Sequence, residues 1–276
     1  MNTKKSTAIK TNQPKKAFDA FNQGVTPTIA CFNKATVPVS QWGVDLDTLI
    51  KAMQEYVDKH VAPIWGTPAK LIKSKDYVKD AWAMVFLDDA DQPRALAYHD
   101  LTPDGLPLSK VFVRTILQDK ASVSVSASHE LVEMLVDPAI NMMTTGPALQ
   151  TSYAHENADP ADDVVLYESA DEETFYAYES ADPVEDLAFK INGVDMSDFV
   201  YPAYFETFHK PRSVKFDHMN KVKRPFQILA GYQTIFRNGR WSNLFATKAT
   251  QESFAKEDRR GHRSEMRKLG TLMRSE

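Results

Sequence analysis

The chain has only one cysteine among its 276 residues, Cys31. A single cysteine cannot form an intrachain disulfide, and it cannot supply the set of thiolates that a Cys-based structural zinc site needs. Such sparing use of cysteine is typical of the reducing cytosol, so a cytoplasmic location is the expectation. Cys31 itself lies in an apolar stretch, and we expect it to be buried and chemically inert.

Several features that mark other classes of protein are also missing. No apolar run is long enough to span a bilayer. Residues 1–16 carry five lysines and no acidic residue, but they lack the apolar segment of a secretory signal. The chain has no Gly-x-Ser-x-Gly elbow, no P-loop and no Gly-x-Gly-x-x-Gly fingerprint. These absences argue against a membrane protein, a serine hydrolase, and a protein that binds nucleotide phosphates or dinucleotides.

Positive charge is absent from a long central stretch. Residues 121–189 contain 15 Asp and Glu and no Lys or Arg, whereas the whole chain has a formal charge of -4. The remainder of the chain is therefore strongly basic. A dense set of carboxylates is costly to fold unless a cation or protonation relieves the repulsion. The basic ends are expected to be solvated tails or to anchor on an acidic partner, and the acidic centre disfavours nucleic-acid binding.

The N-terminal half predicts a mixture of strands and helices. A 3.6-residue apolar period predicts a helix that starts after Asp45 or Asp47 and runs to about Val61. A second helix is predicted over 124–136, where Pro138 stops it. Apolar runs predict strands at 28–32, 81–87, 95–99 and 110–116.

The C-terminal half predicts mostly strands and loops. Strands are predicted at 164–168 and 174–179, and Asn-Gly pairs at 192–193 and 238–239 predict two tight hairpins. The predicted fold class is therefore α+β. We expect four segments: a basic flexible arm at 1–27, a sheet with the metal-binding helix at 28–146, a β-rich and loop-rich half that completes a cleft at 147–248, and a charged tail at 249–276.

The helix predicted over 124–136 is the most informative segment. His129, Glu133 and Asp137 follow one another at i, i+4 and i+8, so they share one helix face, and Glu130 lies beside them. This is the layout of the His-Glu-x-x-His zinc-peptidase helix, with Glu133 in place of the second histidine. His129 and Glu133 are therefore candidate metal ligands, and Glu130 is a candidate general base. Asp137 could add a further carboxylate or cap the chain after the helix.

A third metal ligand must come from another segment. Glu179 and Asp182 are spaced i, i+3 in an acidic stretch, so one helical turn would point both in the same direction. Asp182 is the first choice, with Glu179 as a ligand or as a partner behind the ligands. One imidazole with two or three carboxylates suits zinc, and also manganese, iron or calcium. His99, at the end of a predicted strand, is expected to have a structural role.

The predicted helix resembles the active-site helix of the zincin metallopeptidases. More closely, the string Ser-His-Glu-x-x-Glu-Met-Leu-x-Asp-Pro at 128–138 resembles that of an uncharacterised bacterial and phage family with a zincin-like pattern. The resemblance implies a zincin-like fold, a twisted sheet over an active-site helix. It also implies that His129 and Glu133 bind the metal, that Glu130 is the base and that Asp182 is the third ligand. Further similar stretches extend it over about residues 28–245: 62–66, 98–112, 182–185, 200–205 and 225–241.

These features predict a metal-dependent hydrolase of the zincin type that acts as a peptidase on peptide or protein substrates. Glu130 would take a proton from water that the metal activates. The strand at 110–116 is expected to be a sheet edge that pairs with an extended peptide. One alternative is a structural or interaction protein of a phage particle, located in the virion, with a silent or structural metal and basic tails that bind a partner. Another is a calcium-binding module with oxygen ligands only, which would exclude His129.

Overall fold

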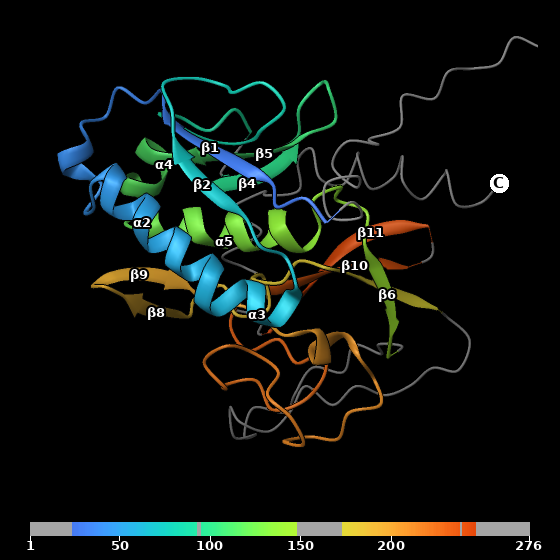
Figure 1. Cartoon of the computed structure of the whole chain (residues 1–276). Helices are drawn as coiled ribbons and strands as arrows, with labels where there is room; N and C mark the ends of the chain where they lie inside the picture. Colours follow the sequence, from blue (N-terminus) through green and yellow to red (C-terminus); the bar gives the residue numbers. More distant parts are fainter. Residues whose placement is uncertain (1–23, 93–94, 148–172, 238, 247–276) are drawn as a thin grey trace, which may run out of the picture.

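The computed structural model describes residues 24–92, 95–147, 173–237 and 239–246 (Figure 1). It contains a five-stranded sheet, a four-stranded sheet, a two-stranded hairpin and several helices, which confirms the predicted α+β class. Most of the predicted basic arm, the predicted tail and the predicted strand at 164–168 lie outside the described residues. No helix in the described part of the chain is both long and apolar enough to cross a bilayer.

The first sheet has the strand order β2-β1-β3-β5-β4. The first three strands in this order and β5 are parallel to one another, whereas β4 runs antiparallel at the edge. The central strands β1 and β3 are buried on both faces, which explains their nearly continuous apolar sequences. The strands are β1 (Thr28–Asn33), β2 (Lys70–Lys73), β3 (Trp82–Leu87), β4 (Ala97–Leu101) and β5 (Pro107–Phe112).

The prediction of an edge strand over 110–116 is wrong in two respects. Strand β5 ends at Phe112, and helix α4 (Val113–Gln118) follows at once. In addition, β5 pairs with β3 on one side and β4 on the other, so the edge belongs to β4. The sequence misleads here because a short apolar run has no period that separates a buried strand from a buried helical turn. Val113 and Ile116 are both fully buried in the helical form.

Helix α2 (Leu46–Tyr56) covers one face of the first sheet (Figure 1). Of the two predicted caps, Asp45 is the one that starts the helix, since its carboxylate accepts the backbone N–H of Thr48 at 2.9 Å. A π-helical turn (Val57–Val61) and α3 (Ala62–Trp65) continue it, so the helical segment ends about one turn later than predicted.

The second sheet is antiparallel and has the order β11-β10-β7-β6. Strand β7 confirms the prediction of a strand near 174–179. The turn between β10 and β11 lies at the second Asn-Gly pair, as predicted, although residue 238 itself is outside the described residues. The strands are β6 (Met143–Gly146), β7 (Thr174–Ala177), β10 (Tyr232–Arg237) and β11 (Arg240–Phe245).

The first Asn-Gly pair joins strands β8 (Ala188–Ile191) and β9 (Val194–Ser197), which confirms the other predicted hairpin. Asn192 and Gly193 have φ angles of 50° and 85°. Two successive residues with positive φ are what a type I′ turn requires, and Asn-Gly is its preferred pair.

Helix α5 (Val123–Val136) occupies the interior between the first sheet and this hairpin. It packs against β4 and β5 on one side and against β9 on the other (Figure 1). Ser128 fixes the contact with the hairpin, because its hydroxyl accepts the N–H of Ser197 at 2.8 Å and donates to the carbonyl of Ser124 at 2.8 Å. Since neighbours surround the helix, its polar side chains are carried into the protein interior.

Two apolar cores meet at Trp65 and Tyr178. Both side chains contact the large core between the first sheet and its helices, and both contact the smaller core around Tyr204 and Phe226. Their rings lie 6.1 Å apart in an edge-to-face arrangement. The acidic stretch that begins at Glu179 therefore starts from a rigid, packed junction.

Two buried carboxyl groups, Asp198 and Asp217, form a hydrogen-bonded pair beside the second core. The carboxyl of Asp198 also accepts the N–H of Phe199 at 2.9 Å, and that of Asp217 accepts the N–H of Val222 at 2.7 Å. Burial, followed by the hydrogen bond and the charge of Asp217, raises the pKa of Asp198 to about 8. One proton therefore stays in the pair at neutral pH.

The Asp198–Asp217 pair predicts that stability falls as the pH rises. Folding raises the pKa of Asp198. The stabilisation that its bound proton gives is therefore complete below the ordinary pKa of Asp, about 4, and is lost as the pH rises to about 8. The free energy of unfolding falls by at most about 1.4 kcal/mol per pH unit in this range. We expect Asp198→Asn to remove this part of the pH dependence, because an amide donates a hydrogen bond to Asp217 at any pH. Denaturant unfolding of both proteins between pH 5 and 9 measures the difference, and parallel pH profiles would contradict the prediction.

Candidate metal centre

Helix α5 brings three ionisable side chains into the interior. His129, Glu130 and Glu133 are 8%, 4% and 0% exposed. The helix is capped by Ser122, whose hydroxyl accepts the N–H of Val125 at 3.4 Å. Burying an imidazole and two carboxyl groups this deeply is costly unless their charges are paired or a cation is bound.

Asp182 meets His129 and Glu133 from a different part of the chain. The Nε2 atom of His129 lies 3.3 Å from Oε1 of Glu133 and 3.2 Å from Oδ1 of Asp182. The backbone N–H of Ala181 donates to Oε1 of Glu133 at 3.4 Å, which joins the two segments directly. Asp182 is fully buried. Three of the four side chains that the sequence suggested as ligands therefore place donor atoms within 4.8 Å of one another.

The main chain around Asp182 is hydrogen-bonded to the segment that leads into β10. The carbonyl of Asp182 accepts the N–H of Tyr232 at 3.1 Å, and the carbonyl of Pro183 accepts the N–H of Leu229 at 3.0 Å. Gly231 lies against this main chain with a φ angle of 128°. The position of the Asp182 carboxylate is thus set by backbone contacts as well as by its own side chain.

Glu179 is placed differently from Asp182. Its carboxyl group is fully buried. Among the described residues, however, neither cluster of three donor atoms within 4.8 Å of one another includes it. Its suggested part as a ligand, or as a partner behind the ligands, stays a prediction.

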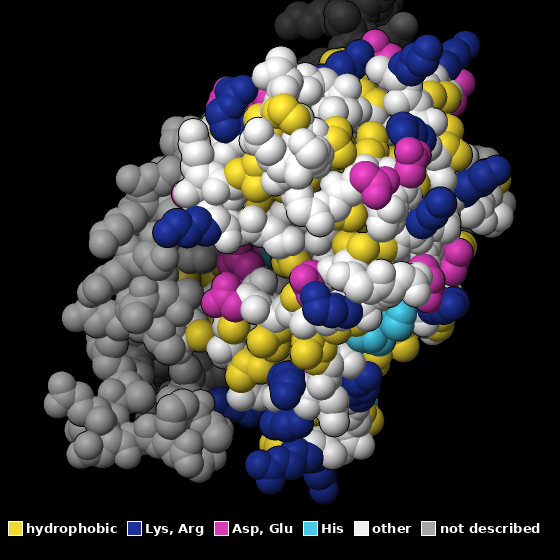
Figure 2. Space-filling model, turned by 90° about the vertical axis from the view of Figure 1, so that its left-hand side faces the viewer, with side chains coloured by type: hydrophobic (Ala, Val, Ile, Leu, Met, Phe, Trp, Pro, Cys, Tyr) yellow, Lys and Arg dark blue, Asp and Glu magenta, His cyan; other side chains and the backbone are white. Residues whose placement is uncertain are grey.

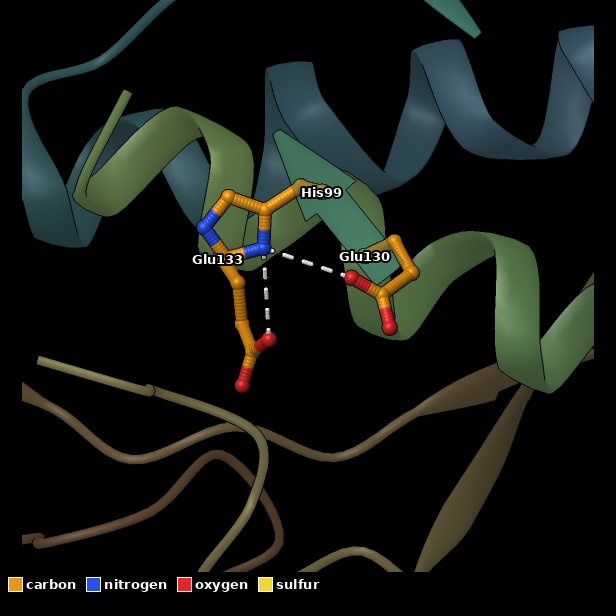
Figure 3. Close-up of side chains that lie close together, drawn as sticks. All are labelled: His99, Glu130 and Glu133. Atoms are coloured by element: carbon orange, nitrogen blue, oxygen red, sulfur yellow. Dashed lines mark hydrogen bonds and ion pairs between the residues drawn. The ribbon is translucent and has the colours of Figure 1, made fainter. Parts of the chain in front are cut away.

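His99 reaches the same centre from strand β4, although the sequence suggested only a structural role. Its Nδ1 atom lies 3.3 Å from Oε2 of Glu130 and 3.7 Å from Oε2 of Glu133 (Figure 3). The side chain is 1% exposed. The sequence around His99 gave little indication of this role, since a histidine at the end of a strand is common. Only the pairing of β4 with β5 and the packing of α5 bring it to Glu130.

Asp137 takes the capping role that the sequence left open. Its two carboxylate oxygens accept the N–H groups of Asn141 at 3.0 Å and Met142 at 2.9 Å. Asp137 therefore fixes the turn after α5, at Pro138, and so helps to set the start of β6.

Charge in the centre alters the acid–base behaviour of His129. Burial by itself would lower the pKa of its imidazole, but the charge of Glu133 and the hydrogen bonds with Asp182 and Glu133 outweigh burial and hold the pKa well above its ordinary value. An imidazole must be neutral to bind a metal ion. A metal that binds His129 would therefore displace a proton.

The donor atoms are also spaced as the ligands of a transition-metal ion would be. Hydrogen bonds between a charged imidazole and a carboxylate are usually about 2.7–2.9 Å long, shorter than the 3.2 and 3.3 Å around His129. Ligands about 2.0–2.2 Å from a tetrahedral zinc ion are separated by roughly 3.3–3.5 Å, which matches these distances. A nitrogen donor in the group favours zinc, manganese or iron over calcium, which prefers oxygen ligands.

The centre opens into a cavity of about 400 Å³. His129 and Glu130 line it from α5, Tyr98 from β4, and Glu185 and Tyr232 from the segments that hold Asp182. Figure 2 shows acidic side chains gathered around a recess on one face of the molecule. A volume of this size suits a small ligand or a few residues of a peptide.

Comparison with known proteins gives no further information about this centre. The chain matches no family model, no curated protein and no solved structure significantly.

Proposed function

We propose that the protein is a metal-dependent hydrolase of the zincin type that cleaves peptide bonds. The observation that supports this most directly is the convergence of His129, Glu133 and Asp182, at distances that suit a shared ion, next to Glu130 on the wall of a cavity. The arrangement of a sheet with an antiparallel edge strand over the helix that carries these residues is consistent with a zincin-like fold.

In this proposal His129, Glu133 and Asp182 hold a zinc ion. A bound zinc ion polarises the substrate carbonyl and lowers the pKa of water toward neutrality. Glu130 accepts the proton of the attacking water and later donates it to the leaving amine. His99 lies 3.3 Å from Oε2 of Glu130 and restricts the orientation of that carboxylate.

Strand β4 is the better candidate for substrate binding, in place of the strand predicted over 110–116. Among the described strands β4 pairs with β5 alone, so its other edge offers backbone groups that an extended peptide can pair with. Ala97 and Tyr98 of β4 line the cavity beside Glu130. A peptide that pairs with β4 would therefore pass close to the proposed metal.

Glu130→Gln tests the proposed mechanism. We expect the ratio kcat/KM for peptide cleavage to fall by about 10²–10⁴, because an amide cannot accept the proton. Cleavage of a mixture of unstructured peptides, followed by mass spectrometry, measures activity, and elemental analysis measures the metal. Glu55→Gln is the matched control, because Glu55 pairs with Lys59 on the surface.

Two results would overturn the proposal. The proposal would be wrong if the purified protein carries no stoichiometric metal even after incubation with zinc. An active protein whose Glu130→Gln form cleaves peptides at the wild-type rate would show that Glu130 is not the base.

The deep burial of the ligands favours one competing function, a scaffold with a purely structural metal. His129, Glu133 and Asp182 are 8%, 0% and 0% exposed, and of the three only His129 lines the cavity. Such a protein would act through partners, for instance in a virion and through its basic ends. The absorption spectrum of the cobalt-substituted protein separates the two functions, because an open coordination position responds to added azide and a closed site does not.

A further inference from the structure

Two groups of metal-binding side chains meet at Glu133. His129, Glu133 and Asp182 form one group, and His99, Glu130 and Glu133 form the other. The two oxygens of Glu133 face different imidazoles, since Oε1 lies 3.3 Å from Nε2 of His129 and Oε2 lies 3.7 Å from Nδ1 of His99. Glu133 therefore lies between two sets of donors and belongs to both.

The spacing in the second group resembles that in the first. The Nδ1 atom of His99 is 3.3 Å from Oε2 of Glu130 and 3.7 Å from Oε2 of Glu133. A single N–H can make a well-directed hydrogen bond to only one of these oxygens, and both distances exceed the usual 2.7–2.9 Å of a charge-assisted hydrogen bond. Donors that surround a tetrahedral metal ion at about 2.0–2.2 Å are separated by roughly 3.3 Å or more. A shared cation explains both distances at once.

Burial and direction support the same conclusion. His99, Glu130 and Glu133 are 1%, 4% and 0% exposed, so water screens their charges poorly. In Figure 3 the labelled side chains converge from β4 and α5, with Nδ1 of His99 directed at both carboxylates. The second oxygen of Glu130 points away from the other two side chains in that view, so one oxygen faces this group and the other does not.

We propose that the protein holds a second divalent transition-metal ion between His99, Glu130 and Glu133, and that the Glu133 carboxylate bridges the two ions. The inference rests on the proposed function only in that it needs the first ion at His129. Paired ions held by a bridging carboxylate are a known arrangement in hydrolases, where they clamp the attacking and leaving groups. Glu130 would bind the second ion through the oxygen that faces His99 and use its other oxygen as the base.

The number of bound ions tests this inference. The full-length protein is stripped with a chelator, dialysed against buffered zinc and subjected to elemental analysis. We expect two ions per chain in the wild type and one in His99→Gln, in which affinity for the second ion falls at least about 100-fold. His209→Gln is the matched control, because His209 pairs with Glu206 away from the centre, and it should keep two ions.

A second measurement uses the wild type alone and so does not depend on whether a variant folds. Two manganese ions bridged by Glu133 should give an exchange-coupled electron paramagnetic resonance spectrum. Two ions without coupling would overturn the bridge, and two ions in a folded His99→Gln would place the second ion elsewhere and overturn the site. One ion in both the wild type and His99→Gln would overturn the inference while the proposed function stands. No bound ion at all would overturn both.

Discussion

Replacing Glu133 with glutamine is expected to cause the largest loss of metal affinity of any single change in the centre. Glu133 is fully buried in the last turn of α5, and among the described residues it alone belongs to both donor groups, facing His129 and His99. The glutamine side chain has nearly the same shape, but it is neutral and presents an NH₂ group to one of the imidazoles. Affinity for zinc should fall by more than about 100-fold, beyond what the loss of an outer hydrogen-bond partner costs.

Competition with a chromophoric chelator measures this affinity directly. Asp182→Asn provides the comparison, because Asp182 contacts His129 but belongs to the first donor group alone. We expect Glu133→Gln to be the more severe of the two. Circular dichroism of both metal-free variants checks that they are folded. An unchanged zinc affinity in a folded Glu133→Gln protein would rule out Glu133 as a ligand.

Gly231→Ala is expected to destabilise the protein strongly, although Gly231 carries no functional group. A Cβ atom at this position would lie 2.1 Å from the carbonyl oxygen of Asp182 and 2.9 Å from Cβ of Glu185. The φ angle of 128° adds strain for any residue other than glycine. Together, backbone strain and overpacking should cost about 2–5 kcal/mol, or about 5–15 °C in melting temperature.

Gly193→Ala separates the two causes of this loss. Gly193 also has a positive φ, 85°, but a Cβ atom there would meet nothing within 4 Å. It should therefore show the cost of the backbone conformation without the steric overlap. Thermal unfolding of both variants gives the comparison. We also expect zinc affinity to fall in Gly231→Ala alone, because relief of the overlap displaces Asp182. Equal effects of the two substitutions would contradict this account.

The sequence was sufficient for features that depend on local chemistry. The 3.6-residue period of α2, the cap at Asp45 and the hairpin turn at Asn192 are determined by residues that are close in sequence, and the structure confirms each of them. The spacing of His129 and Glu133 on one helix face has the same local origin. Asp182 was suggested by its i, i+3 spacing from Glu179 within a stretch that is rich in carboxylates and has no Lys or Arg.

Features that depend on strand order and on packing could not be read from the sequence. His99 belongs to the centre only because β4 lies at the edge of the sheet next to α5. The interior position of β5 and the switch to helix at Val113 likewise depend on neighbours distant in sequence. Gly231 gives no sequence signal at all, since its importance lies in its close approach to the backbone of Asp182.

The donors of the centre come from three segments that are far apart along the chain: β4, α5 and the stretch attached to β10. In the unfolded chain they do not meet, so an ion whose ligands come from two of these segments binds only the native state. Such an ion adds RT ln(1 + [M]/Kd) to stability, about 4 kcal/mol at a thousandfold excess over Kd. Resistance to heat and proteolysis would then follow the free metal concentration, and the supply of metal in the cell would set how much folded protein persists.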